Sequence, residues 1–310
     1  IEDELPTFAT RYPKRKIESA RARELYRQPL LVIPETPGED RLTPQSFLIA
    51  KTDVCFSKSF YGYSAAGHQE ADLLIALLHV LVHSTSFRHF CYMRSPRIGA
   101  GRRTIYKQDI DAFPFPILED LSKEDRAQAL ALADALDSPD PKAWEALDAF
   151  VCGLFGLTKA EQQVVADTVT FNGPYRSVRE PAALPTPPDE VKQFARTLEQ
   201  TLQPFFRVAG QKVKAAVVPR IDEDWRQPWR FVTLLLDGDT WEPTPTLIAS
   251  LMAEATQSAA SRVVMPLPEG GLTIGLINKR RFWTRSRARL CALHIAHEHL
   301  TAAFPLTTKK

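Results

Sequence analysis

The chain has 310 residues, of which 44% are hydrophobic and 25% are charged, and its formal net charge is +2. This composition is typical of a globular protein of two or three domains, with enough apolar residues to build its cores without a disulfide or a structural metal. The four cysteines lie far apart and form no CxxC pair, which argues against a disulfide framework and predicts reduced, mostly buried thiols.

The sequence gives no sign of a membrane segment or a signal peptide. Its longest apolar run, residues 73–82, is shorter than the about 20 residues that a membrane-spanning helix needs. The acidic first residues do not resemble a signal peptide, so we expect a cytoplasmic protein with no membrane partner. Because the sequence does not begin with Met, we also expect it to begin inside a longer protein.

The first predicted domain comprises residues 1–118 and combines short strands with one long helix. A basic segment with helical tendency precedes the first strand, and the strands are expected where short apolar runs are bounded by proline or polar residues: 30–33, 46–50 and 52–60. Residues 61–67 are predicted to form a loop, and residues 70–93 a helix with one buried apolar stripe. A loop with glycine and proline follows at residues 95–101.

The rest of the chain is predicted to form a helical segment and then a separate domain. Residues 119–180 contain three helical patterns, the first with Ser122 as its N-terminal cap, and the proline-rich stretch 181–188 is interpreted as a linker between domains. Residues 181–310 form an α/β domain in which the order helix–strand–strand occurs twice before a closing helix. The helices are expected at 189–206, 246–260 and 284–301, and the strands at 212–218, 229–236, 263–267 and 272–277. The predicted fold class is therefore α+β.

Side chains that could support catalysis or bind a metal are few, and none forms a complete set. The pairs His79 and His83, and His294 and His297, have helical spacing, but no acid or cysteine completes either metal site, so packing or helix capping is expected instead. Acidic residues after two predicted strands, at 222–224 and 237–239, lack the companion lysine of a nuclease and are interpreted as turns. We therefore predict no catalytic residue and no metal in this chain.

Basic residues gather in three stretches of the sequence. Residues 11–27 contain seven basic and two acidic side chains, whereas residues 88–107 and residues 274–290 each contain six basic and no acidic ones. Such patches are typical of proteins with a polyanionic partner, although a solvated face is the alternative for any single patch.

Five short motifs follow one another between residues 25 and 116. They are an apolar strand with tyrosine and prolines (LYRQPLLVIP), a small polar strand and loop (FSKSFYG), an apolar helix that ends in aromatics (73–92), a Ser-Gly-basic loop (95–103), and IYKQDI running into FPFP. In this order they resemble the C-terminal target-recognition region of bacterial restriction-modification DNA adenine methyltransferases that carry cleavage, modification and recognition in one polypeptide. The family often has Asn-Ser in the middle of the helix, where this sequence has His83-Ser84.

The resemblance implies a mixed α/β target-recognition module whose loops contact double-stranded DNA. Phosphate contacts are expected from the basic residues Arg94, Arg97, Arg102, Arg103 and Lys107. Contacts to base edges are expected where the polar strand and loop lie, from Ser57, Lys58, Tyr61 and Tyr63.

The methyl-transfer site itself is not expected in this chain. No predicted strand leads into the Gly-rich turn of a nucleoside cofactor site, and the only Pro-Pro pair, at 187–188, is not followed by the aromatic residue of an adenine pocket. S-adenosylmethionine is thus not expected as a cofactor here, and methyl transfer would belong to a catalytic domain in cis or in trans.

Two functions remain open from the sequence. The first is the non-catalytic DNA-recognition part of an S-adenosylmethionine-dependent DNA adenine methyltransferase of the restriction-modification or defence kind. The second is a protein–protein interaction or assembly module of such a complex, without DNA reading of its own. The second is favoured by the acidic segment 119–170, with 4 basic and 11 acidic residues, and by the lack of any motif in 181–310.

Overall fold

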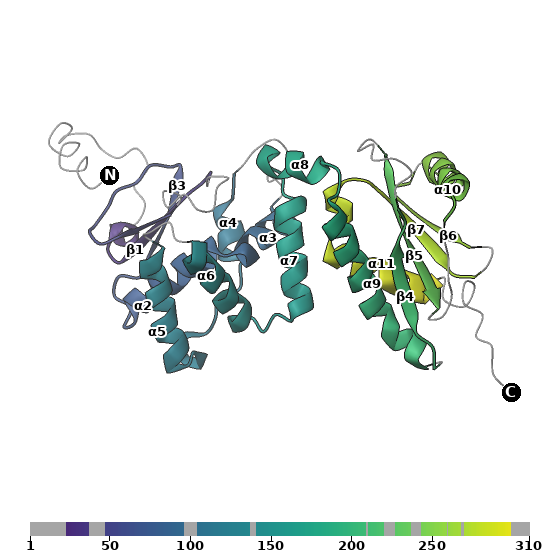
Figure 1. The fold of residues 1–310 in the computed structure, drawn as a ribbon. Helices are drawn as coiled ribbons and strands as arrows, with labels where there is room; N and C mark the ends of the chain where they lie inside the picture. Colours follow the sequence, from purple (N-terminus) through teal and green to yellow (C-terminus); the bar gives the residue numbers. More distant parts are fainter. Residues whose placement is uncertain are drawn as a thin grey trace. The chain divides into compact units, whose positions relative to one another are not determined.

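A computed structural model describes the chain over residues 23–36, 47–95, 104–136, 141–208, 210–219, 227–236, 243–258, 260–267 and 270–298. Both helices and antiparallel sheets are present, which confirms the predicted α+β class (Figure 1). The chain divides into two compact units. Unit 1 comprises residues 1–165 and 173–175, and unit 2 comprises residues 166–172 and 176–310.

Unit 1 contains a three-stranded antiparallel sheet with the order β2-β1-β3 (Figure 1). Its strands are β1 (Leu30–Pro34), β2 (Leu48–Ala50) and β3 (Phe60–Ser64). The central strand β1 has both faces covered, because Leu31 and Ile33 belong to one hydrophobic core and Leu30 and Val32 to another. A strand buried on both faces needs an unbroken apolar run, which is the pattern of this segment.

The third strand lies at residues that the sequence assigned to a loop. No strand forms at 52–59, and β3 begins at Phe60 and pairs with β1 from Phe60↔Pro34 to Ser64↔Leu30. The glycine at its centre, Gly62, argued against a strand in the sequence. In the fold the ring of Phe56 occupies the space beside Gly62, where a Cβ atom would lie 2.2 Å from the ring. A glycine inside a strand often marks such a close approach.

The long helix predicted at 70–93 is two helices, α2 (Ala71–His83) and α3 (Thr85–Arg94), which meet at an angle of 65°. Ser84 separates them, because its Oγ accepts a hydrogen bond from the Phe87 N–H at 3.0 Å and caps α3. The Asp148 carboxylate also accepts hydrogen bonds from the N–H and hydroxyl of Thr85, at 2.7 and 2.6 Å. The partner that fixes this break is distant in the sequence.

Further helices complete unit 1, and two of them, α5 and α6, share a hydrophobic core with α2 that is distinct from the sheet core. They are α4 (Lys107–Asp111), α5 (Lys123–Ala135), α6 (Pro141–Leu154) and α7 (Lys159–Phe171), with 3-10 turns η1 (Arg23–Tyr26) and η3 (Leu118–Asp120). Leu77 of α2 and Leu147 of α6 are fully buried in the shared core with α5. Ser122 caps α5, as the sequence predicted, in a capping box with Asp125. Helix α7 is shared by the two units, because its residues up to Val165 belong to unit 1 and those from Ala166 onward belong to unit 2.

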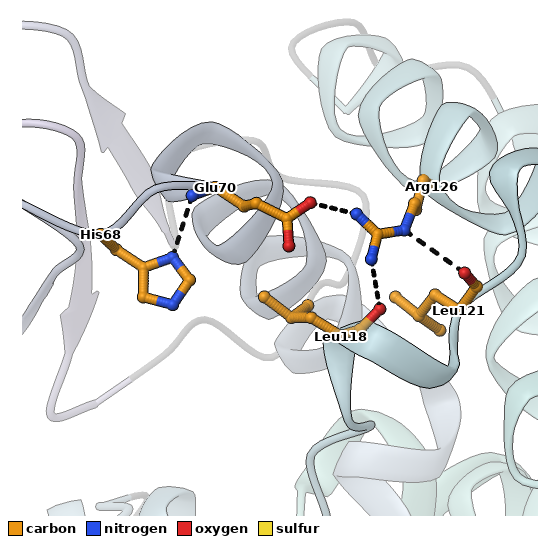
Figure 2. Close-up of polar contacts among 5 residues, drawn as sticks. All are labelled: His68, Glu70, Leu118, Leu121 and Arg126. Carbon is orange, nitrogen blue, oxygen red and sulfur yellow. Dashed lines mark hydrogen bonds and ion pairs between the residues drawn. The ribbon is translucent and has the colours of Figure 1, made fainter.

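One arginine joins three segments of unit 1. Figure 2 shows Arg126 of α5 bonded to the Glu70 carboxylate and to the carbonyl oxygens of Leu118 and Leu121, the latter two at 2.6 and 3.3 Å. Glu70 directly precedes α2, and its N–H donates to His68 Nδ1 at 3.1 Å. These bonds connect the start of α2, the turn η3 and the first turns of α5.

Unit 2 contains a four-stranded antiparallel sheet with the order β4-β5-β7-β6. Its strands are β4 (Val213–Val217), β5 (Trp229–Leu236), β6 (Arg262–Pro266) and β7 (Leu272–Ile277). Helices α9 (Pro188–Val208) and α11 (Arg285–Glu298) cover one face, and α10 (Pro245–Gln257) covers the other (Figure 1). The helix–strand–strand order therefore occurs twice before the closing helix, as expected from the sequence.

The stretch interpreted as a linker is partly helical. Helix α8 (Arg176–Ala183) runs through Pro181, α9 begins at Pro188, and only residues 184–187 between them are non-helical. Proline removes one backbone N–H donor, and in a helix of eight residues this costs a single intrahelical bond. Proline density alone therefore misassigned this segment.

Within the described ranges, no single helix is long and apolar enough to cross a membrane, and α2 with α3 match a broken span by length and composition only. The described part of the chain also contains four free cysteines, of which Cys55 is exposed and Cys91, Cys152 and Cys291 are buried.

Candidate nucleic-acid interface

Two segments predicted to contact DNA are tied to one end of the unit 1 sheet. Glu35, which follows β1, donates its N–H to the Ser59 carbonyl at 2.8 Å and accepts from the Ile105 N–H at 2.9 Å. The Tyr61 hydroxyl donates to the Ile105 carbonyl at 3.0 Å. We call the surface formed by Ser57–Ser59 and Glu35, with the buried residues Thr104–Ile105 behind it, the sheet-end surface. Ile105 lies two residues after the basic stretch 97–103 in the sequence, so the C-terminal flank of that stretch is fixed beside the turn at 57–59.

The turn at residues 57–59 presents exposed polar side chains on a fixed base. Ser57 and Lys58 are exposed, and the Ser57 Oγ accepts from the Ser59 N–H at 3.3 Å, which holds the turn closed. Phe56, directly before the turn, packs against Gly62 and lies 5.1 Å from the Tyr26 ring. Among the described residues, no carboxylate lies within ion-pairing distance of Lys58. Its charge is therefore available to an external anion.

Three other predicted residues come together, but their polar groups are bound within the protein. The Tyr63 hydroxyl donates to Asp111 Oδ1 at 2.7 Å, and Lys107 Nζ lies 2.8 Å from each Asp111 oxygen and 4.6 Å from the centre of the Tyr63 ring. Burial, followed by the hydrogen bond to Asp111, raises the pKa of the Tyr63 hydroxyl. With the Tyr61–Ile105 bond, these contacts anchor α4 and the segment before it to β3.

Asp111 was not predicted from the sequence as a site residue, although it forms an ion pair with Lys107. The spacing of four residues between Lys107 and Asp111 is the available signal, because residues so spaced on a helix are neighbours. The two side chains are about half exposed, at 50% and 46%, so the ion pair contributes little to stability while lowering the positive charge that Lys107 presents. Tyr63, Lys107 and Asp111 also line an apolar cavity of about 350 Å³, together with side chains of α2 and α3.

Of the four arginines predicted to contact phosphates, only Arg94 lies within the described residues. Arg94 is exposed at the last position of α3, and its guanidinium lies 5.8 Å from the centre of the Phe90 ring. Cys91, one turn earlier, belongs to the same hydrophobic core as Ile105 and Ile110. Described residues on both sides of the basic stretch 97–103 therefore pack in the same hydrophobic core. Arg97, Arg102 and Arg103 lie outside the described residues.

The histidine pair of α2 has a packing role. His79 and His83 are buried, with ring centres 4.4 Å apart, and His83 also contacts the Phe47 ring at 4.4 Å. The His83 Nδ1–H donates to the His79 carbonyl at 2.8 Å. Burial, and to a lesser degree the neighbouring His83, holds the pKa of His79 well below its ordinary value. The second pair, His294 and His297, lies on α11, where His294 is bonded to Glu298 at 3.1 Å.

The acidic residues considered for a nuclease site, at 222–224 and 237–239, lie outside the described residues. Comparisons with protein-family models, with curated proteins and with solved structures find no match to this chain. The resemblance to methyltransferase target-recognition regions therefore stays a prediction that rests on the sequence motifs alone.

Proposed function

We propose that unit 1 is a DNA-recognition module, and that this chain is the non-catalytic, sequence-recognising part of an S-adenosylmethionine-dependent DNA adenine methyltransferase of the restriction-modification or defence kind. Its partners would be double-stranded DNA and a methyltransferase catalytic domain, in cis or in trans. The reaction of the whole enzyme would transfer a methyl group from S-adenosylmethionine to an adenine that has been flipped out of the duplex.

The observation that carries the proposal is the sheet-end surface. The hydrogen bonds of Glu35 hold the turn Ser57–Ser59 beside Ile105, which follows the basic stretch 97–103. Proteins commonly contact DNA through loops that a rigid scaffold positions, and phosphate contacts fix the register in which base edges are read. An exposed lysine in a fixed turn, held beside the residue that follows a basic stretch in the sequence, fits that arrangement.

The geometry also refines the roles within the proposed site. Lys58 is a phosphate-contacting candidate, because it is exposed and forms no ion pair with any described carboxylate. Lys107 is partly neutralised by Asp111, and the hydroxyls of Tyr61 and Tyr63 already donate hydrogen bonds inside unit 1. We therefore assign the two tyrosines and Lys107 to positioning, and Ser57, Lys58, Arg94 and the arginines of 97–103 to DNA contact.

The experiment compares three single substitutions of lysine by glutamine in fluorescence-anisotropy titrations of the full chain against a labelled DNA duplex. Lys58→Gln should weaken binding and reduce the slope of log affinity against log salt by about 1, because one phosphate contact is lost. Lys107→Gln should have a smaller effect on binding and on the salt slope, since Asp111 already neutralises part of the Lys107 charge. Lys123→Gln, at an exposed position of α5, is the matched control.

Equal affinities for the Lys58→Gln and Lys123→Gln variants would contradict the assignment of the sheet-end surface. The assembly function predicts a different pattern, in which the intact chain shows no salt-dependent affinity for duplex DNA and none of the three substitutions matters.

A further inference from the structure

A second basic surface lies in unit 2, which has its own sheet and core. Here β6, η4 (Arg280–Phe282) and α11 enclose a pocket of about 360 Å³. We call it the arginine pocket, and its main wall residues are Ser261, Arg262, Phe282, Arg287, Leu290 and Cys291. It corresponds to the third basic stretch of the sequence, residues 274–290, to which the DNA-recognition function assigns no role.

The fold of unit 2 explains why two arginines, Arg262 and Arg287, line this pocket. Strand β6 lies at the edge of the sheet, and Val264 on it packs into the core beneath α9 and α11. Because side chains alternate along a strand, Arg262 points to the same face as Val264, and its Nη1 lies 3.9 Å from Cys291 Sγ. Arg287 is four residues before Cys291 on α11 and therefore lies on the same side of that helix.

The described residues place no acidic side chain against the positive charge of the arginine pocket. The guanidinium carbons of Arg281 and Arg287 lie 5.0 and 5.5 Å from the centre of the Phe282 ring. In the part of the chain that the structure describes, no carboxylate lies within ion-pairing distance of Arg262, Arg281 or Arg287. The adjacent Arg280 differs, because it is bound to Glu190 of α9 at 2.6 Å. Three guanidinium groups gathered without an acid are a favourable setting for an external anion.

The chemistry of the walls narrows the class of that anion. Guanidinium groups bind phosphate and carboxylate oxygens through paired N–H donors, and they do so best where water is partly excluded. Leu276 and Cys291 form a buried floor, and Phe282 and Leu290 add apolar wall that a bare inorganic ion would not contact. A volume of about 360 Å³ is at the small end for ligand pockets, so it suits a compact molecule with one anionic group and one apolar or ring part.

We propose that the arginine pocket binds the phosphoryl group of an organic phosphate of the nucleoside monophosphate class, with Arg262 and Arg287 as its anion ligands. Phe282 and Leu290 contact the remainder of the ligand, and Arg281 adds positive charge at the rim. The phosphoryl group comes either from a free nucleotide or from the phosphorylated end of a nucleic acid strand. The site is independent of the function proposed for unit 1.

The electrostatics of Cys291 agree with this arrangement. Burial raises the pKa of its thiol, while the nearby guanidinium groups of Arg262 and Arg287 act in the opposite direction. Both arginines therefore lie close enough to Cys291, on the floor of the pocket, for their charge to act on its thiol.

The test is calorimetric titration of the full chain with AMP, inorganic phosphate and adenosine at low salt. AMP should bind most tightly, inorganic phosphate more weakly, and adenosine not measurably. The double substitution Arg262→Gln and Arg287→Gln should weaken AMP binding by about tenfold or more, because two charge-assisted contacts are lost. Arg285→Gln is the matched control, since it lies on the same helix but its guanidinium contacts Gln193 of α9 at 3.4 Å.

Arg287→Gln alone, at an exposed helix position, keeps the test valid if the double variant does not fold. Each of three results would overturn the proposal. They are the absence of binding of both AMP and inorganic phosphate, equal affinities for AMP and adenosine, and an AMP affinity that Arg287→Gln leaves unchanged. A parallel titration with a short oligonucleotide, with and without a 5′-phosphate, distinguishes the two sources of the phosphoryl group. The Lys58→Gln variant should bind AMP normally, so failure of this site and failure of the DNA-recognition function give different results.

Discussion

Arg126 shows how a single planar side chain organises unit 1. Its three nitrogens reach the Glu70 carboxylate and the carbonyl oxygens of Leu118 and Leu121, so it satisfies two backbone acceptors of the η3 segment and links them to the start of α2 (Figure 2). Glu70 and Arg126 are partly exposed, at 38% and 28%, which reduces the electrostatic contribution. Arg126 therefore stabilises unit 1 mainly through the planar geometry of its guanidinium, whose N–H donors reach three acceptors at once.

We expect both Arg126→Ala and Arg126→Lys to lower the free energy of unfolding of unit 1 by about 1–2 kcal/mol, because lysine supplies the charge but not the divergent donors. Urea denaturation followed by circular dichroism measures this. Arg176→Lys, at an exposed i,i+4 pair with Glu180, is the control and should change stability little. A lysine variant as stable as the wild type would show that charge alone explains the role of Arg126.

His79 predicts a pH dependence of stability. Its pKa in the folded protein is held well below 6.5 by burial, so the unfolded state binds a proton that the folded state does not. The stabilisation is therefore present above about pH 6.5 and is lost as the pH falls toward the folded pKa, at up to about 1.4 kcal/mol per pH unit.

His79→Leu should remove part of this acid sensitivity, because leucine has no proton to bind. Melting temperatures of the wild type and the variant, compared at neutral and mildly acid pH, provide the measurement. His297→Gln changes an exposed histidine of α11 and should leave the acid sensitivity intact. The same loss of stability on acidification in the wild type and in His79→Leu would be evidence against this role.

At the scale of elements, the β6–β7 hairpin depends on two glycines in the left-handed region. Gly270 has φ of 95° and Gly271 has φ of 103°. A Cβ atom on Gly271 would lie 2.5 Å from the Leu234 carbonyl oxygen of β5, whereas one on Gly270 would meet nothing within 4 Å. An alanine at either position would therefore adopt an unfavourable left-handed backbone conformation, but only an alanine at position 271 would also clash with β5.

We expect Gly270→Ala to destabilise unit 2 by about 1–2 kcal/mol, which is the cost of a left-handed alanine. Gly271→Ala should cost clearly more, because the hairpin must also move away from β5. Chemical denaturation of the two variants gives the comparison. Equal losses of stability would show that the contact with Leu234 does not constrain the turn.

Elements with strong local patterns could be predicted from the sequence, and elements fixed by distant partners could not. The strands of unit 2 and its helices α9, α10 and α11 were predicted to within a few residues, and Ser122 with Asp125 is a local capping signal. In contrast, β3 depends on its pairing with β1 and on the Phe56 ring over Gly62, and the break between α2 and α3 involves Asp148, 63 residues from Thr85. The candidate site follows the same rule. Tyr61, Tyr63 and Lys107 were proposed from motifs. The partners that define the roles of the two tyrosines, the Ile105 carbonyl and Asp111, are distant in the sequence, whereas the ion pair of Lys107 with Asp111 is local.

At the scale of the whole molecule, a net charge of +2 is too small to attract DNA by itself. The proposed DNA binding therefore depends on local basic surfaces, and the described residues form one in each unit, in different settings. The surface of unit 1 combines an exposed turn with an anchored basic stretch, whereas that of unit 2 is a pocket with an apolar floor. The first suits an extended duplex and the second a compact phosphate.

The central claim is that the basic stretch 97–103 contacts DNA phosphates, and the salt dependence of duplex binding tests it most directly. In the double variant Arg102→Gln and Arg103→Gln, the slope of log affinity against log salt should fall by about 2, while the preference among duplex sequences stays unchanged, because phosphates carry no base identity. Duplex affinity that this double substitution leaves untouched, at both low and moderate salt, would contradict the account.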